Sequence, residues 1–165
     1  MHPDHGPVSF SLWIYIQESD SGVIYIHETG MNIVTSESET TDQAGIKFRI
    51  RDNPSWADGQ ESYSMSEIPE ISLNKWHHLV IVADSTNYIR MYINNDLTYS
   101  DNNMRGHNDR HSDWWNDVSL GGWYGGAPEN WDTGSGFVNG KVSDLRIYDT
   151  ALSEEQISQI YTNTA

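Results

Sequence analysis

The segment from Ser100 to Asp117 carries the side chains best suited to binding a metal ion. It is rich in Asp and Asn, and every acidic residue in it is Asp. Calcium takes about six to eight oxygen ligands, which short carboxylates and amides can supply together with backbone carbonyls of the same loop. We therefore predict a calcium site with the ligands Asp101, Asn103, Asp109 and Asp113.

Two other interpretations of this segment stay open. It is equally consistent with a solvated acidic loop that binds no ion, because the chain as a whole is acidic. His107 and His111, together with Asp109, could hold a transition metal such as zinc, although the sequence indicates no fourth ligand. An EF-hand loop does not fit, since Arg105 stands where an oxygen ligand is expected and Ser112 where the bidentate Glu should be.

Tryptophans form the second group of candidate binding residues. Four of the seven lie in or beside two long segments without apolar periodicity, 100–117 and 123–136. An indole ring can stack on the apolar C–H face of a sugar while Asn, Asp and Arg side chains bind the hydroxyls. Any single ring could instead pack its own loop onto the protein. For the set we predict a ligand site formed by Arg110, Trp114, Trp115, Trp123, Tyr124, Asn130, Trp131 and Asp132.

The adjacent histidines His77 and His78 are interpreted differently. They lie in an apolar strand pattern, where neighbouring side chains point to opposite faces of a sheet. The two therefore cannot bind one metal ion together. We expect both to be packed or hydrogen-bonded inside the protein.

Composition excludes several classes of partner. The chain has 165 residues, 24 Asp plus Glu against 9 Lys plus Arg, a formal charge of −15 and no cysteine. Such a charge repels phosphate backbones and anionic membrane surfaces, so neither nucleic acid nor membrane insertion is expected. The length fits one domain, 1–165, and the start of the chain resembles neither a signal peptide nor a membrane span. We expect a piece excised from a longer protein.

Strands must position the two long segments 100–117 and 123–136, and the sequence carries several strand patterns. Alternating apolar residues at 8–16, and shorter runs at 22–28, 32–36 and 45–51, are typical of half-buried strands. The segment 76–84 is apolar on both faces and is predicted to be a central strand. A hairpin is expected to turn at Asn94 and Asn95, which tolerate the left-handed conformation. The pattern predicts an all-β antiparallel sandwich.

A strand and then a helix are expected at the end of the chain. The alternation from Lys141 to Ile147 places Leu145 on one face of the strand and Val142 on the other. Ser153 and Gln156 have the spacing of a capping box, so a short helix should start at Ser153. Its apolar stripe is too small for the helix to be stable alone, so the helix must lie against the folded sheets.

Four segments, 10–16, 76–84, 89–97 and 140–161, resemble the laminin G-like group of the concanavalin A-like lectin/glucanase jelly rolls, in its bacterial form. The resemblance implies a two-sheet jelly-roll sandwich with one short C-terminal helix. It also implies a binding module of an exported protein, commonly specific for glycans and often assisted by calcium. Glucanases of this fold carry an E-x-D-x-x-E pattern on one strand, and the sequence lacks that spacing.

We therefore expect a non-catalytic glycan-binding module of a secreted or cell-surface bacterial protein such as an adhesin, assisted by calcium. The alternative is a protein- or peptide-binding adhesion module that uses the same loops. A purely structural spacer is a third possibility, in which case loop substitutions would change nothing but stability.

Overall fold

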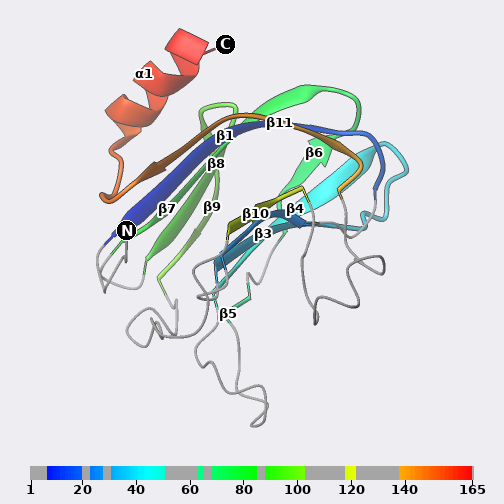
Figure 1. Ribbon diagram of the computed structural model, residues 1–165, viewed down its shortest axis with the longest axis horizontal. Coiled ribbons are helices and arrows are strands. Elements are labelled where there is room, and N and C mark those ends of the chain that lie inside the picture. The colour runs from blue at the N-terminus through cyan, green and yellow to red at the C-terminus, as the bar shows by residue number, and fades with distance from the viewer. Residues whose placement is uncertain are drawn as a thin grey trace, which may run out of the picture.

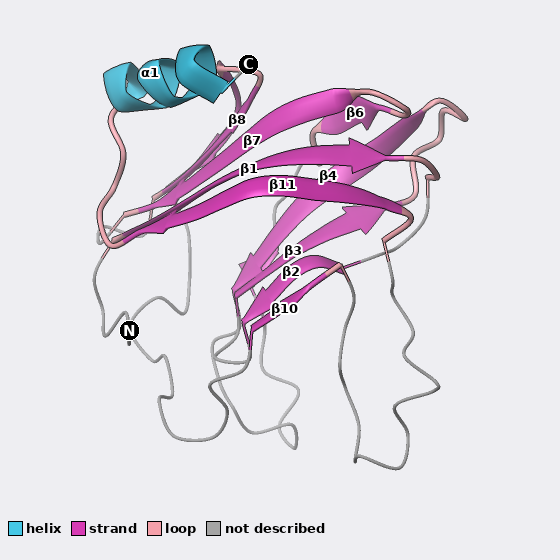
Figure 2. Ribbon diagram, turned by 45° about the horizontal axis from the view of Figure 1, so that its top comes forward, coloured by secondary structure: helices cyan, strands magenta, loops and turns pink. Residues whose placement is uncertain are grey.

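The computed structural model describes residues 7–19, 23–27, 31–50, 63–64, 68–84, 88–102, 118–121 and 138–164. Within these residues the chain forms eleven strands and one helix. The strands make two antiparallel sheets that face each other, and the helix lies on the outside of one of them (Figures 1 and 2). This arrangement is the predicted two-sheet jelly-roll sandwich.

Sheet A has five strands in the order β11-β1-β7-β8-β9. Sheet B has six, with the path β10-β2-β3-β4-β5 and β6 pairing with β4. The predicted central strand, β7, is indeed the middle strand of sheet A. The strands of sheet A are β1 (Val8–Ile16), β7 (Trp76–Ala83), β8 (Ile89–Ile93), β9 (Asp96–Asp101) and β11 (Gly140–Tyr148). Those of sheet B are β2 (Val23–His27), β3 (Met31–Ser36), β4 (Gln43–Ile50), β5 (Tyr63–Ser64), β6 (Glu70–Ser72) and β10 (Val118–Leu120).

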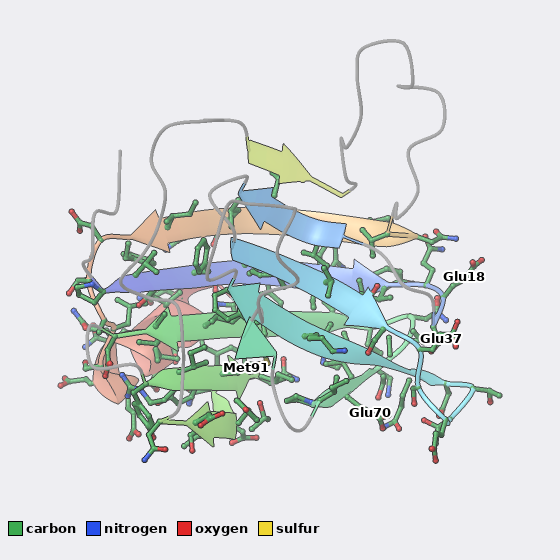
Figure 3. The ribbon with its side chains drawn as sticks, turned by 90° about the horizontal axis from the view of Figure 1, so that it is seen from below. Glu18, Glu37, Glu70 and Met91 are labelled. Atoms are coloured by element: carbon green, nitrogen blue, oxygen red, sulfur yellow. The ribbon has the colours of Figure 1, made fainter. Side chains whose placement is uncertain are left out.

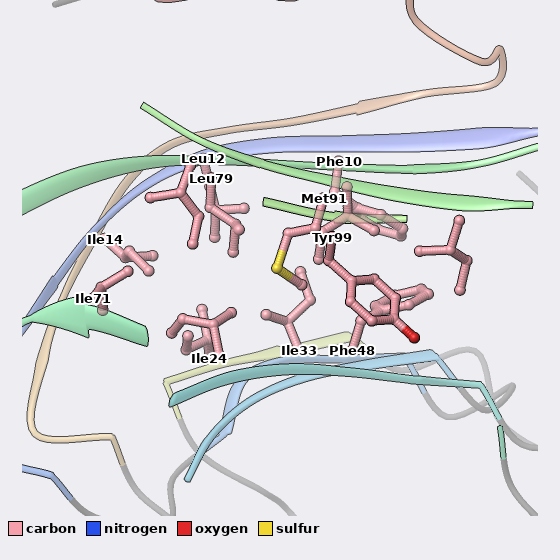
Figure 4. Close-up of a cluster of buried hydrophobic side chains, with 14 of the residues drawn as sticks. Phe10, Leu12, Ile14, Ile24, Ile33, Phe48, Ile71, Leu79, Met91 and Tyr99 are labelled. Carbon is pink, nitrogen blue, oxygen red and sulfur yellow. The ribbon is translucent and has the colours of Figure 1, made fainter. Parts of the chain in front are cut away.

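The core between the sheets follows from the alternation in β1. Every second residue of this strand points inward and is at most 3% exposed, from Val8 to Ile16. Phe10 meets Phe48 of sheet B with ring centroids 6.3 Å apart. Figure 4 shows the side chains of the two sheets meeting in one apolar layer. Burial of these side chains is the main force that holds the two sheets together.

The outer face of sheet A is also apolar, because the helix α1 (Glu154–Thr164) covers it. Val80 and Val82 of β7 pack there against Leu152 and Ile157. This second layer explains why β7 is apolar on both faces. α1 is the one helix of the described ranges, and none there is long and apolar enough to cross a membrane.

Both predicted local motifs are confirmed. Ser153 N donates to Gln156 Oε1 at 2.9 Å, and Gln156 N donates to Ser153 Oγ at 3.3 Å, which is a reciprocal capping box. The hairpin between β8 and β9 turns at Asn94 and Asn95, with φ of 54° and 73°. Two consecutive left-handed residues match the twist of the flanking strands.

The predicted alternation of β11 is wrong at Asp144. Ser11 pairs with Arg146 and Trp13 pairs with Ser143, so an extra residue is inserted in β11. Asp144 takes a positive φ of 50° to accommodate this bulge. As a result Val142 and Leu145 both pack against the core, although strict alternation would put them on opposite faces.

Candidate functional site

The sandwich has two ends. The two segments that carry the predicted binding residues, 103–117 and 122–137, start from different ends. At the Asp101 end, β9 finishes and β1 begins in sheet A, while β4 finishes and β10 begins in sheet B. At the Gly140 end, β1 finishes and β7 and β11 begin. The Phe10–Phe48 contact joins the two sheets near the first end, and a hydrogen bond from Val138 N to Gly121 O joins them at the second.

The ends of the segment 122–137 are held together at the Gly140 end. Val138 N donates to Gly121 O at 3.0 Å, and Gly121 N donates to Ile24 O at 3.0 Å. Gly121 has a φ of 76°, which a residue with a side chain would adopt only under strain. Asn139 O accepts from Gln17 N at 2.8 Å, which continues the pairing of β1 with the start of β11. The segment therefore enters and leaves the sandwich at one fixed point.

The segment 103–117 begins and ends at the Asp101 end. It follows Asn102, just after β9, and precedes Val118, the first residue of β10. β9 and β10 are edge strands of different sheets. β10, three residues long, and Gly121 separate this segment from the 122–137 segment. The first and last Cα atoms of β10 are about 7 Å apart at the usual strand rise.

Of the predicted metal ligands, only Asp101 belongs to the described ranges. It ends β9 opposite Ile89, and its Oδ2 accepts a hydrogen bond from Tyr99 Oη at 3.1 Å. The structure thus places one carboxylate where the segment 103–117 begins. No group of three or more His, Asp or Glu in the described ranges could hold a metal ion. Asn103, Asp109 and Asp113 lie outside the described residues.

The predicted ligand-binding residues also lie outside the described residues, so they remain predictions. What the structure adds is the location of the segments that carry them. The described residues that flank these segments are Asn102 and Val118 for one and Gly121 and Val138 for the other. The predicted ligand-binding residues concerned are Arg110, Trp114, Trp115, Trp123, Tyr124, Asn130, Trp131 and Asp132.

The prediction for the two histidines is confirmed. His77 is 8% exposed, and its Nε2 donates to Ser72 O at 3.0 Å while its Nδ1 accepts from Asn94 Nδ2 at 3.1 Å. His78 is 1% exposed and faces the helix side, with Nε2 2.9 Å from Ser11 Oγ. Burial lowers the pKa of His78 to about 4, so it is neutral at physiological pH. Neither histidine is placed for metal binding or surface chemistry.

One aromatic group on the surface was missed by the sequence analysis. Tyr15 of β1 and Trp76 of β7 are direct cross-strand partners, with ring centroids 5.6 Å apart and ring planes 55° apart. Trp76 is 45% exposed. Lys141, the partner of Tyr15 on β11, holds its Nζ 5.4 Å from the centre of the Tyr15 ring. We call these three residues the Trp76 platform; the sequence could not reveal it because it depends on the strand order.

Sequence comparison assigns the chain to a family. The family model for the Concanavalin A-like lectin/glucanases superfamily, a laminin G-like model, matches residues 2–158. The chain belongs to this superfamily, and the predicted fold and laminin G-like resemblance are confirmed. No curated protein matches the chain significantly.

Solved structures of similar fold include a candidate carbohydrate-binding protein of Bacteroides ovatus, 20% identical, with a TM-score of 0.63 over 94% of this chain and 40% of the other. The ligand-binding domain of botulinum neurotoxin serotype D, solved with N-acetylneuraminic acid, is 16% identical, with a TM-score of 0.63 over 96% and 37%. A heptameric SAP-like pentraxin of Limulus polyphemus is 16% identical, with a TM-score of 0.64 over 96% and 71%. This chain thus spans two fifths or less of the first two proteins. At these identities the likeness shows the fold alone.

Proposed function

We propose that this chain is a non-catalytic glycan-binding module of a secreted or cell-surface bacterial protein such as an adhesin. The observation that carries the proposal is membership of the concanavalin A-like lectin/glucanase superfamily over residues 2–158. Structural neighbours associated with carbohydrate and with N-acetylneuraminic acid support it at the level of ligand class. Fold alone does not define function, so the ligand must be argued from particular residues.

The main sugar contacts are assigned to the segment 122–137. Gly121 and Val138, the residues that flank it, are joined by a hydrogen bond, so the segment starts and ends at one point of the sandwich. It contains Trp123, Tyr124 and Trp131, and Asn130 and Asp132 flank Trp131. An aromatic face next to amide and carboxylate groups is the chemistry that recognises a pyranose ring. Arg110, Trp114 and Trp115 would add contacts from the other segment.

Calcium is proposed to assist binding by ordering the segment 103–117. Asp101 stands at its start with a carboxylate fixed by Tyr99. Asn103, Asp109 and Asp113 would complete the oxygen ligands, which is the type of donor that calcium prefers. The ion would supply a charge that offsets the mutual repulsion of these aspartates.

We propose that the module is non-catalytic, because its described carboxylates do not suit acid–base catalysis. A glycoside hydrolase needs two carboxyl groups facing one bond, and the general acid is normally desolvated. Figure 3 shows Glu18, Glu37 and Glu70 near the Gly140 end, where all three are exposed to water. The Glu70 carboxylate accepts a hydrogen bond from Ser38 Oγ at 2.7 Å. Such exposed groups suit a solvated surface better than an acid–base pair.

A glycan array read in calcium and in chelator tests the proposal. We expect binding of a defined group of glycans at micromolar to millimolar affinity, weakened by chelator. The change Trp131→Ala should lower that affinity at least about tenfold, because it removes a stacking face. A peptide library screened in parallel tests the alternative adhesion module. If peptides bind, Trp131→Ala leaves them unaffected and no glycan binds at millimolar sensitivity, the glycan assignment is wrong.

A further inference from the structure

On the outer face of sheet A, the contacts of the helix α1 with β1 extend as far as Trp13. Ser9 Oγ, at the start of β1, donates to Thr150 O at 2.7 Å and accepts from Leu152 N at 3.0 Å. Further along β1, Trp13 Nε1 donates to Thr164 Oγ1 at 3.0 Å, in the last turn of α1. The next outward residue is Tyr15, which lies beyond the described end of the helix.

The platform defined above occupies this uncovered part of the face. Trp76 is exposed although its neighbours along β7, from His77 to Ala83, are all buried. Lys141 covers one side of the Tyr15 ring, so Tyr15 is supported from β11. Its other contact is the tilted Trp76 ring, 5.6 Å away. The result is an exposed indole that packs against Tyr15, which is itself supported by Lys141.

The size of the platform limits what can bind there. A stable protein interface buries at least about 1,200 Å² in total, whereas one aromatic side chain provides roughly 150–250 Å². The other large exposed apolar side chains of the described ranges do not extend the patch. Ile68 precedes β6, Leu97 and Leu120 belong to β9 and β10, and Ile147 of β11 pairs with Phe10, toward the other end of β1 from Tyr15. A single ring is the ligand that this surface fits.

The chemistry of the three side chains indicates a sugar ring. Indole offers its face to the C–H groups of a pyranose, and a neighbouring ammonium group donates hydrogen bonds to hydroxyl or carboxylate oxygens. Lys141 is also one of only 9 basic residues in a chain of charge −15. Tyr15 lies between Trp76 and Lys141, so a sugar that extends from Trp76 across Tyr15 meets a positive charge that favours an anionic group.

We propose that Tyr15, Trp76 and Lys141 form a second saccharide subsite, which stacks a pyranose ring on Trp76 and prefers a ring that carries a carboxylate. This proposal rests on the glycan-binding function proposed above. The platform lies at the Gly140 end, where the segment 122–137 has its fixed base.

The test measures affinities for matched neutral and carboxylated oligosaccharides chosen from the array, by titration calorimetry. Trp76→Ala should weaken binding of both about tenfold, the usual effect of losing a stacked ring. Trp76→Phe should retain part of the affinity, since it keeps an aromatic face. Lys141→Gln should weaken binding of the carboxylated form by several fold more than that of the neutral form.

Leu97→Ala is the matched control, because Leu97 is 49% exposed on β9 and does not belong to the platform. It should leave both affinities unchanged, and thermal midpoints of all variants show whether they remain folded. If Trp76→Ala folds and binds as the wild type does, the subsite is wrong while the module remains a lectin. Equal losses for both ligands with Lys141→Gln would contradict the carboxylate preference. If the wild type binds no glycan, the proposed function itself fails.

Discussion

At the residue scale, the buried His78 links the stability of the domain to pH. It packs against the rings of Trp13 and Tyr161, and its Nδ1 has no hydrogen-bond partner within the described protein. Burial is the main cause that lowers its pKa from 6.5 to about 4; Asp144 opposes this shift and Arg146 adds to it. Burial also lowers the pKa of His77, so the two histidines act in the same direction.

The sign of the effect follows from the two states of His78. Its folded pKa is lower than its unfolded pKa, so the unfolded chain takes up the proton first as the pH falls. The stabilisation is complete above pH 6.5 and is lost as the pH falls toward 4. The expected loss at pH 4.5 is about 2–3 kcal/mol, at roughly 1.4 kcal/mol per pKa unit.

Urea unfolding of the wild type and His78→Phe at several pH values, from about 7.5 down to about 4.5, measures this contribution. The variant keeps an aromatic ring that packs against Trp13 and Tyr161, but this ring cannot take up a proton. Its free energy of unfolding should fall less steeply with decreasing pH than that of the wild type. Carboxylates contribute equally to both proteins and cancel in the difference. Two parallel curves would show that His78 is not responsible.

At the element scale, Ser9 fixes the helix to the sheet. Its hydroxyl is fully buried and satisfies both Thr150 O and Leu152 N in the link between β11 and α1. Ser9→Ala would leave the buried Leu152 N and also Thr150 O without this partner, so we expect the free energy of unfolding to fall by about 1–3 kcal/mol. Ser143→Ala on β11, at an exposed serine, is the control and should change it little. Equal effects in both variants would contradict this role for Ser9.

The elements also show how far the sequence could predict the structure. Motifs that depend on nearby residues were predictable: the inward face of β1, the Asn94–Asn95 turn and the Ser153–Gln156 capping box. The bulge at Asp144 was not, because the alternation of residue types continues through it and the insertion appears only against β1. Its bent backbone and the Asp144–Arg146 ion pair, at 2.8 Å, also make this edge strand a poor template for another strand.

At the scale of the whole molecule, strand order decides which candidate residues can act together. The grouping of the two Trp-rich segments into one site stays a prediction, because their residues lie outside the described ranges. The strand order brings Tyr15 and Trp76 side by side, although they are far apart in the sequence. Residue types that bind sugars could be identified from the sequence. Their grouping required the pairing of β1 with β7 and β11.

Calcium should couple the Asp101 end to the stability of the entire domain. The carboxylates of the segment 103–117 repel one another together with Asp101, and a bound cation would relieve this repulsion only in the folded state. An ion that binds only the folded state adds about 2.7 kcal/mol at a hundred times its dissociation constant. For a domain of this size, such a gain raises the thermal midpoint by several degrees.

Thermal unfolding of chelator-stripped protein, titrated with calcium and separately with magnesium, tests this coupling. We expect the midpoint to rise with calcium and to respond less to magnesium, which prefers a tighter octahedral site. The double change Asp109→Ala and Asp113→Ala should abolish the rise, since it removes two proposed ligands. Glycan affinity should increase with calcium by the same factor as calcium affinity increases with glycan, because the coupling is reciprocal. If calcium does not change the thermal midpoint of the wild type, the metal site is wrong. If calcium raises the midpoint of the double variant equally, the ion binds elsewhere.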